Sequence, residues 1–338
     1  MTIALPTTLL RGRDAVEPAL RTAVDSLDAD SARLARYHFG WTDVAGRPTA
    51  GSGGKAVRPA FALLSAQAVG ASWAVAVPGA VAVELVHNFS LLHDDLMDGD
   101  VERRHRRTVW AQWGAPAAIL CGDALLALAT SVLLDVGTID AVEAARLVAA
   151  TTQELIRGQH RDLAFEDAAD VSVDECLDMA AGKTGALLSC SAAIGAVLGG
   201  ADAGTVDALA TYGAELGLAF QLIDDLLGIW GNPGTTGKPV GSDLRARKKS
   251  LPITWATTHG GATGRALAAW LQTDGPDTDD DIAAAAALVE SAGGRAWAAE
   301  EARRRLAIGE RALSAAAIDS DARDELVALG RFIVTRES

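Results

Sequence analysis

The amino-acid sequence predicts an all-α fold. Hydrophobic residues make up 49% of the 338 residues, whereas aromatic residues make up only 5%. Long stretches rich in Ala, Leu, Val and Gly favour closely packed helices, because small side chains let helix axes approach one another. Strand-like alternation of apolar and polar residues is scarce along the whole sequence. The sequence therefore predicts a protein built from packed helices.

Helix-compatible segments follow one another along the chain. Stretches rich in Gly, Pro and Asp separate them, notably at residues 45–54, 232–241 and 274–281. Gly70 and Pro78 also indicate two helices joined near residues 71–78. The expected helices are residues 14–34, 56–70, 78–98, 115–135, 139–165, 172–198, 203–229, 251–258, 281–292, 294–315 and 320–336.

The charge balance limits the kinds of partner. A net charge of −14 argues against a general nucleic-acid binder, which needs a broad basic surface to displace counterions. Basic residues cluster only locally, at residues 103–107 and 245–249. An anionic ligand is therefore expected to be small and to bind at those points.

The cysteines and the apolar runs predict a cytoplasmic protein. Cys121, Cys176 and Cys190 occur singly, which indicates neither a disulfide framework nor a zinc site. The first residues lack the pattern of a secretory signal. Residues 61–92 are long and apolar, but Pro78 and several polar residues interrupt them, so buried core helices are expected there rather than a transmembrane segment.

The stretch LLHDDLMDGDVERRHRRT, residues 91–108, carries the first chemical signal. On a helix, Asp94 and Asp98 lie one turn apart on one face, and His87 lies two turns earlier near the same line. Neighbouring carboxylates repel each other and favour a bound cation, and oxygen ligands beside phosphate suit Mg²⁺. A solvated helix end would explain an isolated acidic motif, but leucines before it and arginines after it favour a metal–diphosphate site.

A second acidic pair echoes the first. Asp224 and Asp225, in QLIDDLLG at residues 221–228, also follow an apolar helical run. Two carboxylate-bearing helix ends can face each other across one cavity only if both halves of the chain belong to one bundle. We therefore expect Asp94 and Asp224 to converge over a shared cavity.

Six motifs in the same order resemble the trans-isoprenyl diphosphate synthases. They are GGKAVRP (53–59), LVHNFSLLHDDLMDGDVERRHRRT (85–108), GQHRDL (158–163), KTGAL (183–187), FQLIDDLLG (220–228) and GKPVGSDLRARKKS (237–250). The resemblance implies one isoprenoid synthase domain over residues 1–338, folded as a single large helical bundle around a central cavity. It also implies a homodimer.

The resemblance implies a role for each matching residue. Two or three Mg²⁺ ions would bind the first motif at Asp94, Asp95 and Asp98 and the second at Asp224 and Asp225, and Arg103 would contact the allylic diphosphate. The isopentenyl diphosphate would be held by Lys55, Arg58, His87 and Arg104. The allylic leaving group would be held by Lys183, Thr184, Gln221, Lys238 and Lys248. The residues expected to carry catalysis are Asp94, Asp98, Arg103, Lys183, Asp224 and Lys238.

The implied reaction joins isopentenyl diphosphate to dimethylallyl, geranyl or farnesyl diphosphate by ionisation, condensation and proton loss. Carboxylate-bound metal and lysine would stabilise the leaving pyrophosphate, while an apolar tunnel would keep water from the carbocation. No side chain is an obvious general base, and the resemblance implies that the released pyrophosphate takes the proton.

Product length is expected to depend on Phe89, with Ser90 as its small neighbour. Phe89 lies five residues before Asp94, about 7.5 Å lower along a helix, where it could floor the tunnel or simply pack the core. The resemblance implies a twenty-carbon product, with fifteen carbons as the alternative.

Several departures from the family pattern stand out. Ala56 stands where a basic residue is frequent, and Arg106 and Arg107 add charge after the arginine pair. Gly228 replaces a third aspartate of the second motif, so one metal contact is lost or supplied by water. His105 replaces a common glycine after the arginine pair. Elsewhere, Asp279–Asp281 are interpreted as N-terminal helix residues, and Asp123 is expected to cap a helix.

Two other functions remain open. A class I terpene cyclase uses similar aspartates without isopentenyl diphosphate, and it would not need Lys55, Arg58, His87 and Arg104 together. A weakly active or non-catalytic synthase subunit would be expected to have lost an acidic motif or its arginines.

Overall fold

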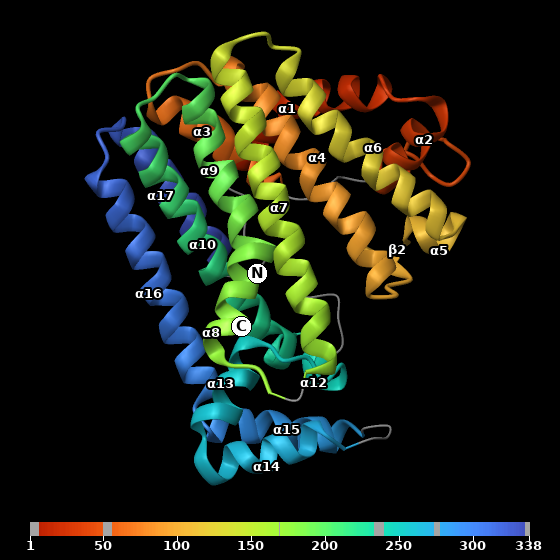
Figure 1. The fold of residues 1–338 in the computed structure, drawn as a ribbon, viewed down its shortest axis with the longest axis vertical. Helices are drawn as coiled ribbons and strands as arrows, with labels where there is room; N and C mark the ends of the chain where they lie inside the picture. The colour runs from red at the N-terminus through yellow and green to blue at the C-terminus, as the bar shows by residue number, and fades with distance from the viewer. Residues whose placement is uncertain (1–6, 50–55, 169, 233–239, 274–277, 335–338) are drawn as a thin grey trace. The chain divides into compact units, whose positions relative to one another are not determined.

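The structure is a computed structural model that describes residues 7–49, 56–168, 170–232, 240–273 and 278–334. Helices make up nearly all of this part of the chain, and the only paired strands in it form one short hairpin (Figure 1). The predicted all-α fold is confirmed.

The chain divides into two compact units, each assembled from segments distant in sequence. Unit 1 comprises Met1–Thr152, Cys190–Ala210 and Ala315–Leu329, and unit 2 comprises Gln153–Ser189, Thr211–Ser314 and Gly330–Ser338. The expectation of a single domain over residues 1–338 stays a prediction.

Unit 1 holds the first helices and the hairpin. Its core forms where α4 packs against α3 and α6, with alanine, valine and leucine side chains between them. The elements lying wholly in unit 1 are α1 (Thr7–Asp25), α2 (Ala29–His38), α3 (Val57–Ala68), α4 (Trp73–Met97), β1 (Glu102–Arg103), β2 (Arg106–Arg107), α5 (Val109–Trp113) and α6 (Ala115–Leu134).

Four helices contribute several residues to each unit, whereas α16 (Gly294–Ala315) reaches unit 1 only with its last residue. The four are α7 (Ile139–Asp167), α9 (Ala186–Leu198), α10 (Ala203–Trp230) and α17 (Ser320–Val334). Their apolar stripes follow the helical period that the sequence shows, and three of the four were expected within two residues of their observed bounds. The fourth, α9, was expected as the second half of one helix over residues 172–198.

Unit 2 has its own apolar core. The remaining helices are α8 (Val173–Ala180), the π-helical turn η1 (Ala181–Gly185), α12 (Ser242–Arg245), α13 (Leu251–His259), α14 (Gly261–Leu271), α15 (Asp279–Ser291) and α16 (Gly294–Ala315). The core residues come from α10 and from α12 to α15, and are Ile229, Leu244, Ile253, Ala256, Leu267, Ile282, Ala285 and Val289.

Local capping explains where the helices differ from expectation. The expected helix 14–34 is two helices, because the Asp28 side chain accepts hydrogen bonds from the N–H groups of Asp30 and Ser31 and starts α2. Likewise α4 begins at Trp73, before Pro78, because Ser72 caps it. Pro78 lies in the second turn of α4, where it removes one backbone hydrogen bond without ending the helix.

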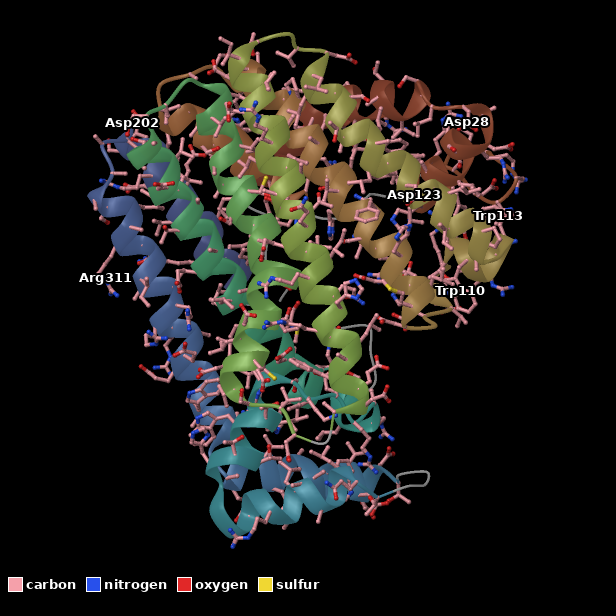
Figure 2. All side chains as sticks on the ribbon, viewed as in Figure 1. Asp28, Trp110, Trp113, Asp123, Asp202 and Arg311 are labelled. Atoms are coloured by element: carbon pink, nitrogen blue, oxygen red, sulfur yellow. The ribbon has the colours of Figure 1, made fainter. Side chains whose placement is uncertain are left out.

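The interpretation of Asp279–Asp281 as helix-start residues is confirmed. Thr278 and Asp281 form a reciprocal capping box at the start of α15, with the other two acids in its first turn. The expectation for Asp123 is wrong, because this residue lies in the middle of α6 (Figure 2). Its preceding Gly122 does not break the helix.

Three helical stretches are long and apolar enough to cross a membrane. They are Trp73–Met97, Ala115–Leu134 and Val173–Leu198, and the structure buries 67%, 33% and 61% of their most apolar windows. Burial within the fold explains the apolar character of the first and third. Helix α6 differs, because most of its apolar window faces away from the packed interior.

A close contact between α9 and α3 depends on Gly195. A Cβ atom at Gly195 would lie 1.9 Å from the Ala62 carbonyl oxygen and 2.4 Å from Ser65 Oγ of α3. Both neighbours are fully buried, so neither can move aside easily.

We therefore predict that Gly195→Ala lowers the free energy of unfolding by about 1–3 kcal/mol, the usual range for overpacking. The matched control is Gly204→Ala near the start of α10, where the nearest atom is an Asp202 carboxylate oxygen at 3.2 Å. Urea denaturation followed by circular dichroism measures both. Equal effects of the two changes would contradict the packing role of Gly195.

Candidate active site

The first acidic motif lies at the carboxyl end of α4. Asp98 is the C-cap residue, and its N–H donates to the Asp94 carbonyl at 2.8 Å. The last turn of α4 contains no basic residue. Carboxylates near a helix C-terminus are disfavoured by about 0.3–1 kcal/mol each, because the helix dipole is negative there. This end of α4 therefore favours a bound cation.

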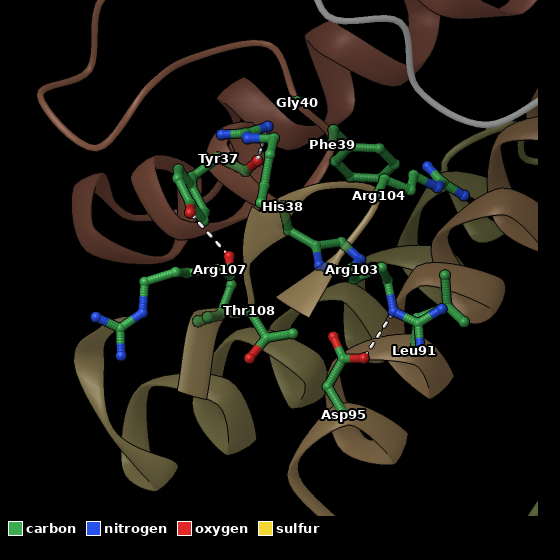
Figure 3. Close-up of a pocket in the computed structure, with 12 residues that line it drawn as sticks. Tyr37, His38, Phe39, Gly40, Leu91, Asp95, Arg103, Arg104, Arg107 and Thr108 are labelled. Carbon is green, nitrogen blue, oxygen red and sulfur yellow. Dashed lines mark hydrogen bonds and ion pairs between the residues drawn. The ribbon is translucent and has the colours of Figure 1, made fainter. Parts of the chain in front are cut away.

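Asp94 and Asp95 are adjacent but lie in different environments. Asp94 is half-buried and Asp98 is exposed, whereas Asp95 is only 1% exposed. Arg103 Nε donates to Asp95 Oδ1 at 2.6 Å (Figure 3), and Asp95 Oδ2 is buried with no hydrogen-bond partner among the described residues. Burial raises the pKa of Asp95, while Arg103 lowers it.

The hairpin that carries the arginines has a two-residue turn. Arg103 pairs with Arg106, so Arg104 and His105 form the turn, with φ of 53° and 61°. Positive φ at both positions is the geometry of a type I′ turn, which normally uses Asn and Gly. Arg104 and His105 therefore occupy a conformation that costs non-glycine residues free energy.

The added arginines after the pair bind the protein itself. Arg106 donates from Nη1 to the Tyr37 carbonyl at 3.0 Å and from Nη2 to the Thr42 carbonyl at 2.7 Å. Arg107 Nη2 donates to the Ala111 carbonyl at 2.9 Å, and the Tyr37 hydroxyl donates to the Arg107 carbonyl at 2.8 Å (Figure 3). These bonds hold the hairpin against α2 and α5.

A cavity of about 130 Å³ lies beside the hairpin. Its lining residues come from α2 and the loop after it, from α4 and from residues 103–109, and include His38, Leu91, Asp95, Arg103 and Arg104. Figure 3 shows the Arg103, Arg104 and His38 side chains around this space. Burial, followed by the charges of Arg103 and Arg104, lowers the pKa of His38 to about 3, so its ring is neutral at pH 7.

A buried polar group joins His38 to α4. Asn88 hydrogen-bonds with the His38 side chain and donates to Glu84 Oε1 at 3.1 Å. Burial raises the pKa of Glu84, and the charges of Arg58 and Arg104 lower it. His38 and Glu84 lie outside the six motifs, and Asn88 lies in the second motif without an expected role. The polar residues at 84 and 88 inside an apolar helix were the available signal.

The residues expected to hold isopentenyl diphosphate belong to unit 1. Burial, then the charges of Arg58, Arg104 and Arg103, keep the pKa of His87 well below its usual value. The structure therefore brings His87 near three predicted arginines, with His87 as an uncharged donor. Lys55 lies outside the described residues.

The second cluster belongs to unit 2 and centres on the π-helical turn η1. Lys183 Nζ lies 2.5 Å from Asp162 Oδ2, and Thr184 Oγ1 donates to Gln221 Oε1 at 2.7 Å. Single π-helical turns inside α-helices occur often at functional sites. Gly158 permits the close approach of α7, because a Cβ there would lie 2.2 Å from the Lys183 nitrogen.

The second acidic motif repeats the pattern of the first. Asp224 is half-buried, whereas Asp225 is 5% exposed. Gln221 Nε2 donates to Asp225 Oδ1 at 2.7 Å, and the Leu251 N–H donates to Asp225 Oδ2 at 2.9 Å. Burial raises the pKa of Asp225 to about 7, with Lys248 acting in the opposite direction. Lys238 lies outside the described residues.

The space at Gly228 is taken by another carboxylate. A Cβ at Gly228 would lie 2.4 Å from both Cγ and Oδ2 of Asp243. Asp243 follows the start of α12, and Ser242 Oγ donates to the Gly228 carbonyl at 3.2 Å. An aspartate at position 228 would collide with Asp243 as it is placed here.

The chain-length residues lie on α4. Phe89 is 6% exposed and is turned about 140° around the helix from Asp94. Ser90 is buried, and its hydroxyl donates to the His87 carbonyl at 2.9 Å. Within the part of the chain that the structure describes, no three acidic, histidine or cysteine side chains already form a complete metal-binding group.

The turn geometry generates a prediction for His105. We predict that His105→Gly raises the free energy of unfolding by roughly 0.5–1 kcal/mol, because glycine adopts positive φ without a Cβ clash. The control is Glu102→Gly in strand β1, which should lower stability. Thermal unfolding by differential scanning calorimetry measures both, and a lower Tm for the His105 variant would contradict the turn assignment.

The comparisons with known proteins agree with these motifs. The family model of polyprenyl synthetases matches residues 41–289. The chain is 52% identical over 326 residues to a (2E,6E)-farnesyl diphosphate synthase of Mycobacterium tuberculosis, covering 96% of this chain and 91% of the relative. It is 45% identical over 332 residues to a geranylgeranyl diphosphate synthase of the same species, covering 97% of this chain and 93% of the relative.

A solved structure also matches the fold along nearly the whole length. A polyprenyl synthetase of Streptomyces coelicolor superposes with a TM-score of 0.94 at 54% identity, covering 98% of this chain and 99% of that one. The resemblance seen in the six motifs is confirmed. The chain belongs to the polyprenyl synthetase family and is a chain-elongating trans-prenyltransferase.

Proposed function

We propose that the chain condenses isopentenyl diphosphate with an allylic diphosphate up to a twenty-carbon product, geranylgeranyl diphosphate. The observation that carries the site assignment is that each acidic motif fixes its second aspartate in the protein and leaves its first more exposed. The bulky Phe89 beside the small Ser90 supports twenty carbons. Farnesyl diphosphate is the second candidate, because the relative at 52% identity is named a farnesyl diphosphate synthase.

Enzymes of this family use Mg²⁺, and the donor set of the chain fits two or three such ions. In this proposal Asp94, Asp98 and Asp224 are direct ligands. Asp95 and Asp225 are the remaining carboxylates of the two motifs, and their hydrogen-bond partners in the protein orient them. Bound Mg²⁺ would supply Lewis-acid stabilisation of charge on the leaving diphosphate.

The same proposal explains Gly228. Asp243 places its carboxylate where a third aspartate of the second motif would stand, so the negative charge expected at position 228 comes instead from the start of α12. In this proposal a water molecule is not needed to replace the missing aspartate of the second motif.

The basic residues divide between the two diphosphates. Lys183, Thr184 and Lys248 would hold the allylic leaving group, with Lys238 as expected from its motif. Asp162 orients the Lys183 ammonium at 2.5 Å, which positions a charge before the substrate arrives. Arg58, His87 and Arg104, with Lys55, would hold isopentenyl diphosphate, and His87 would donate a hydrogen bond as a neutral ring.

Arg103 has a double role in this proposal. Its Nε is bound to the buried Asp95. This ion pair orients the remaining N–H donors of the guanidinium. The allylic diphosphate would accept from them. The apolar walls of the helices would exclude water from the carbocation, and the released pyrophosphate would accept the proton that leaves.

The reaction assay tests this function. Purified protein is incubated with radiolabelled isopentenyl diphosphate and dimethylallyl, geranyl or farnesyl diphosphate, with and without Mg²⁺, and the products are sized. We predict label in a twenty-carbon chain only with Mg²⁺, and a loss of about 100-fold or more in kcat for Asp94→Ala and Asp224→Ala.

The control for these variants is Arg106→Lys, because Arg106 binds backbone carbonyls rather than substrate in this scheme. It should change stability more than kcat. A cyclic hydrocarbon formed from farnesyl or geranylgeranyl diphosphate without incorporated label would instead identify a terpene cyclase. No product of either kind from a folded protein would favour the non-catalytic subunit.

We also propose that the chain forms a homodimer through α6. Leu120 is 65% exposed and Leu134 is 49% exposed, and Ala127 lies midway between them on the same helix face. These apolar residues form an exposed stripe with Asp123 at its edge, and such a stripe on a helix of a protein in water is typical of an interface.

The three cysteines are buried free thiols, which supports the proposed cytoplasmic location.

The interface generates its own prediction. Leu120→Asp should convert the dimer to a monomer, because an unpaired carboxylate would be buried in the contact in place of the most exposed leucine of the stripe. Light scattering coupled to size-exclusion chromatography measures the mass. Val75→Asp, at an exposed position of α4, is the control that should keep the wild-type mass, and a dimeric Leu120 variant would contradict this surface.

A further inference from the structure

Phe89 has a defined neighbour that the motifs did not identify. The rings of Phe89 and His93, one turn apart on α4, meet edge to face with centroids 4.8 Å apart and an interplanar angle of 68°. In a helix, long side chains lean toward the N-terminus over the preceding turn. His93 therefore covers Phe89 from the side of Asp94.

His93 is itself anchored to α6. Its Nε2 lies 3.2 Å from the Ile119 carbonyl oxygen, and 3.9 Å from Asp123 Oδ1 on the same helix. Figure 2 marks Asp123 on this stretch of α6. The shorter contact assigns a proton to Nε2, because the carbonyl oxygen can only accept. This contact fixes the plane of the imidazole ring.

Gly122 provides the space for this anchor. A Cβ atom at Gly122 would lie 2.3 Å from His93 Nε2 and 2.5 Å from its Cδ2. Any other residue at position 122 would therefore push the imidazole away from α6. Glycine in the middle of a helix is less stable than alanine there, so its use at this position needs a compensating contact.

These contacts form one chain from α6 to the expected tunnel floor. Gly122 admits the imidazole, the Ile119 carbonyl orients it, and the imidazole closes one side of the space around Phe89. A phenylalanine on a helix can move between two χ1 rotamers, and a ring packed over it from the next turn leaves less room for that change.

We propose that His93 is a positioning residue for product length, and that it holds the Phe89 ring in place from a notch made by Gly122. This inference rests on the proposed role of Phe89 in ending chain growth. His93 would act through Phe89 and would not contact the diphosphates.

The test compares product lengths made from isopentenyl diphosphate and geranyl diphosphate with Mg²⁺. Wild type, His93→Ala and Phe89→Ala are assayed, and the dephosphorylated alcohols are separated by chromatography and identified by mass. We expect both variants to raise the ratio of longer to shorter products by about tenfold, the scale of discrimination by one missing apolar contact. The double variant should not exceed the larger single effect.

Gly122→Ala tests the notch. If position 122 had room for a Cβ atom, alanine would stabilise the helix and raise the Tm. We expect instead that the collision with His93 lowers the Tm and alters the product ratio. In the Gly122→Ala/His93→Ala protein the collision is gone. Its Tm should recover, and its product ratio should equal that of His93→Ala.

The matched control is Ala284→Gly, an exposed position in the middle of α15 in unit 2. It weakens a helix without touching α4 or α6, so it should lower Tm and leave the product ratio unchanged. This separates a change in product length from a general loss of stability.

The outcomes distinguish the two proposals. No labelled product from wild type would overturn the proposed function itself. If wild type is active and Phe89→Ala shifts the ratio while His93→Ala does not, the positioning role is overturned. An unchanged ratio in Phe89→Ala, or equal Tm losses for Gly122→Ala with and without His93, would overturn it as well.

Discussion

The constraint on which the site depends is negative charge at the carboxyl end of α4. The helix dipole, the neighbouring carboxylates of Asp94 and Asp98, and the lack of a basic residue in the last turn all act in the same unfavourable direction. Arg103 offsets part of this by pairing with the buried Asp95. The hairpin must then hold Arg103 in place, and the bonds of Arg106 and Arg107 to backbone carbonyls of neighbouring segments anchor it.

Adjacent aspartates on a helix point about 100° apart, and both acidic motifs use this difference. In each pair the second carboxylate turns into the protein and meets a fixed donor, Arg103 for Asp95 and Gln221 with the Leu251 N–H for Asp225. The first carboxylate of each pair stays more exposed. An Asp-Asp sequence thus places two chemically identical residues in different surroundings, one held by donors of the protein and one more exposed.

The sequence was sufficient for elements with a long apolar period and for motifs that carry charge. It predicted α10 within one residue, and two of the residues expected to hold the allylic leaving group, Thr184 and Gln221, are hydrogen-bonded to each other in the structure. It missed the hairpin, because two-residue strands have no period to detect. It also missed η1 and the contribution of His38. An extra residue in a helical turn, and the contact of His38 with Asn88, fifty residues along the chain, arise only from tertiary packing.

Glycine explains several of these tertiary contacts at once. In a chain with few aromatic residues, the volume left by a missing Cβ determines which group can enter: a backbone carbonyl at Gly195, an imidazole at Gly122 and a carboxylate at Gly228. The third case changes the reading of the family pattern, because replacing an aspartate by glycine normally suggests a lost charge. Here the glycine admits the Asp243 carboxylate into the same space, so the charge near the second motif is retained while its source moves from α10 to α12. A departure from a motif therefore has to be judged by what occupies the vacated volume, not by the residue that is absent.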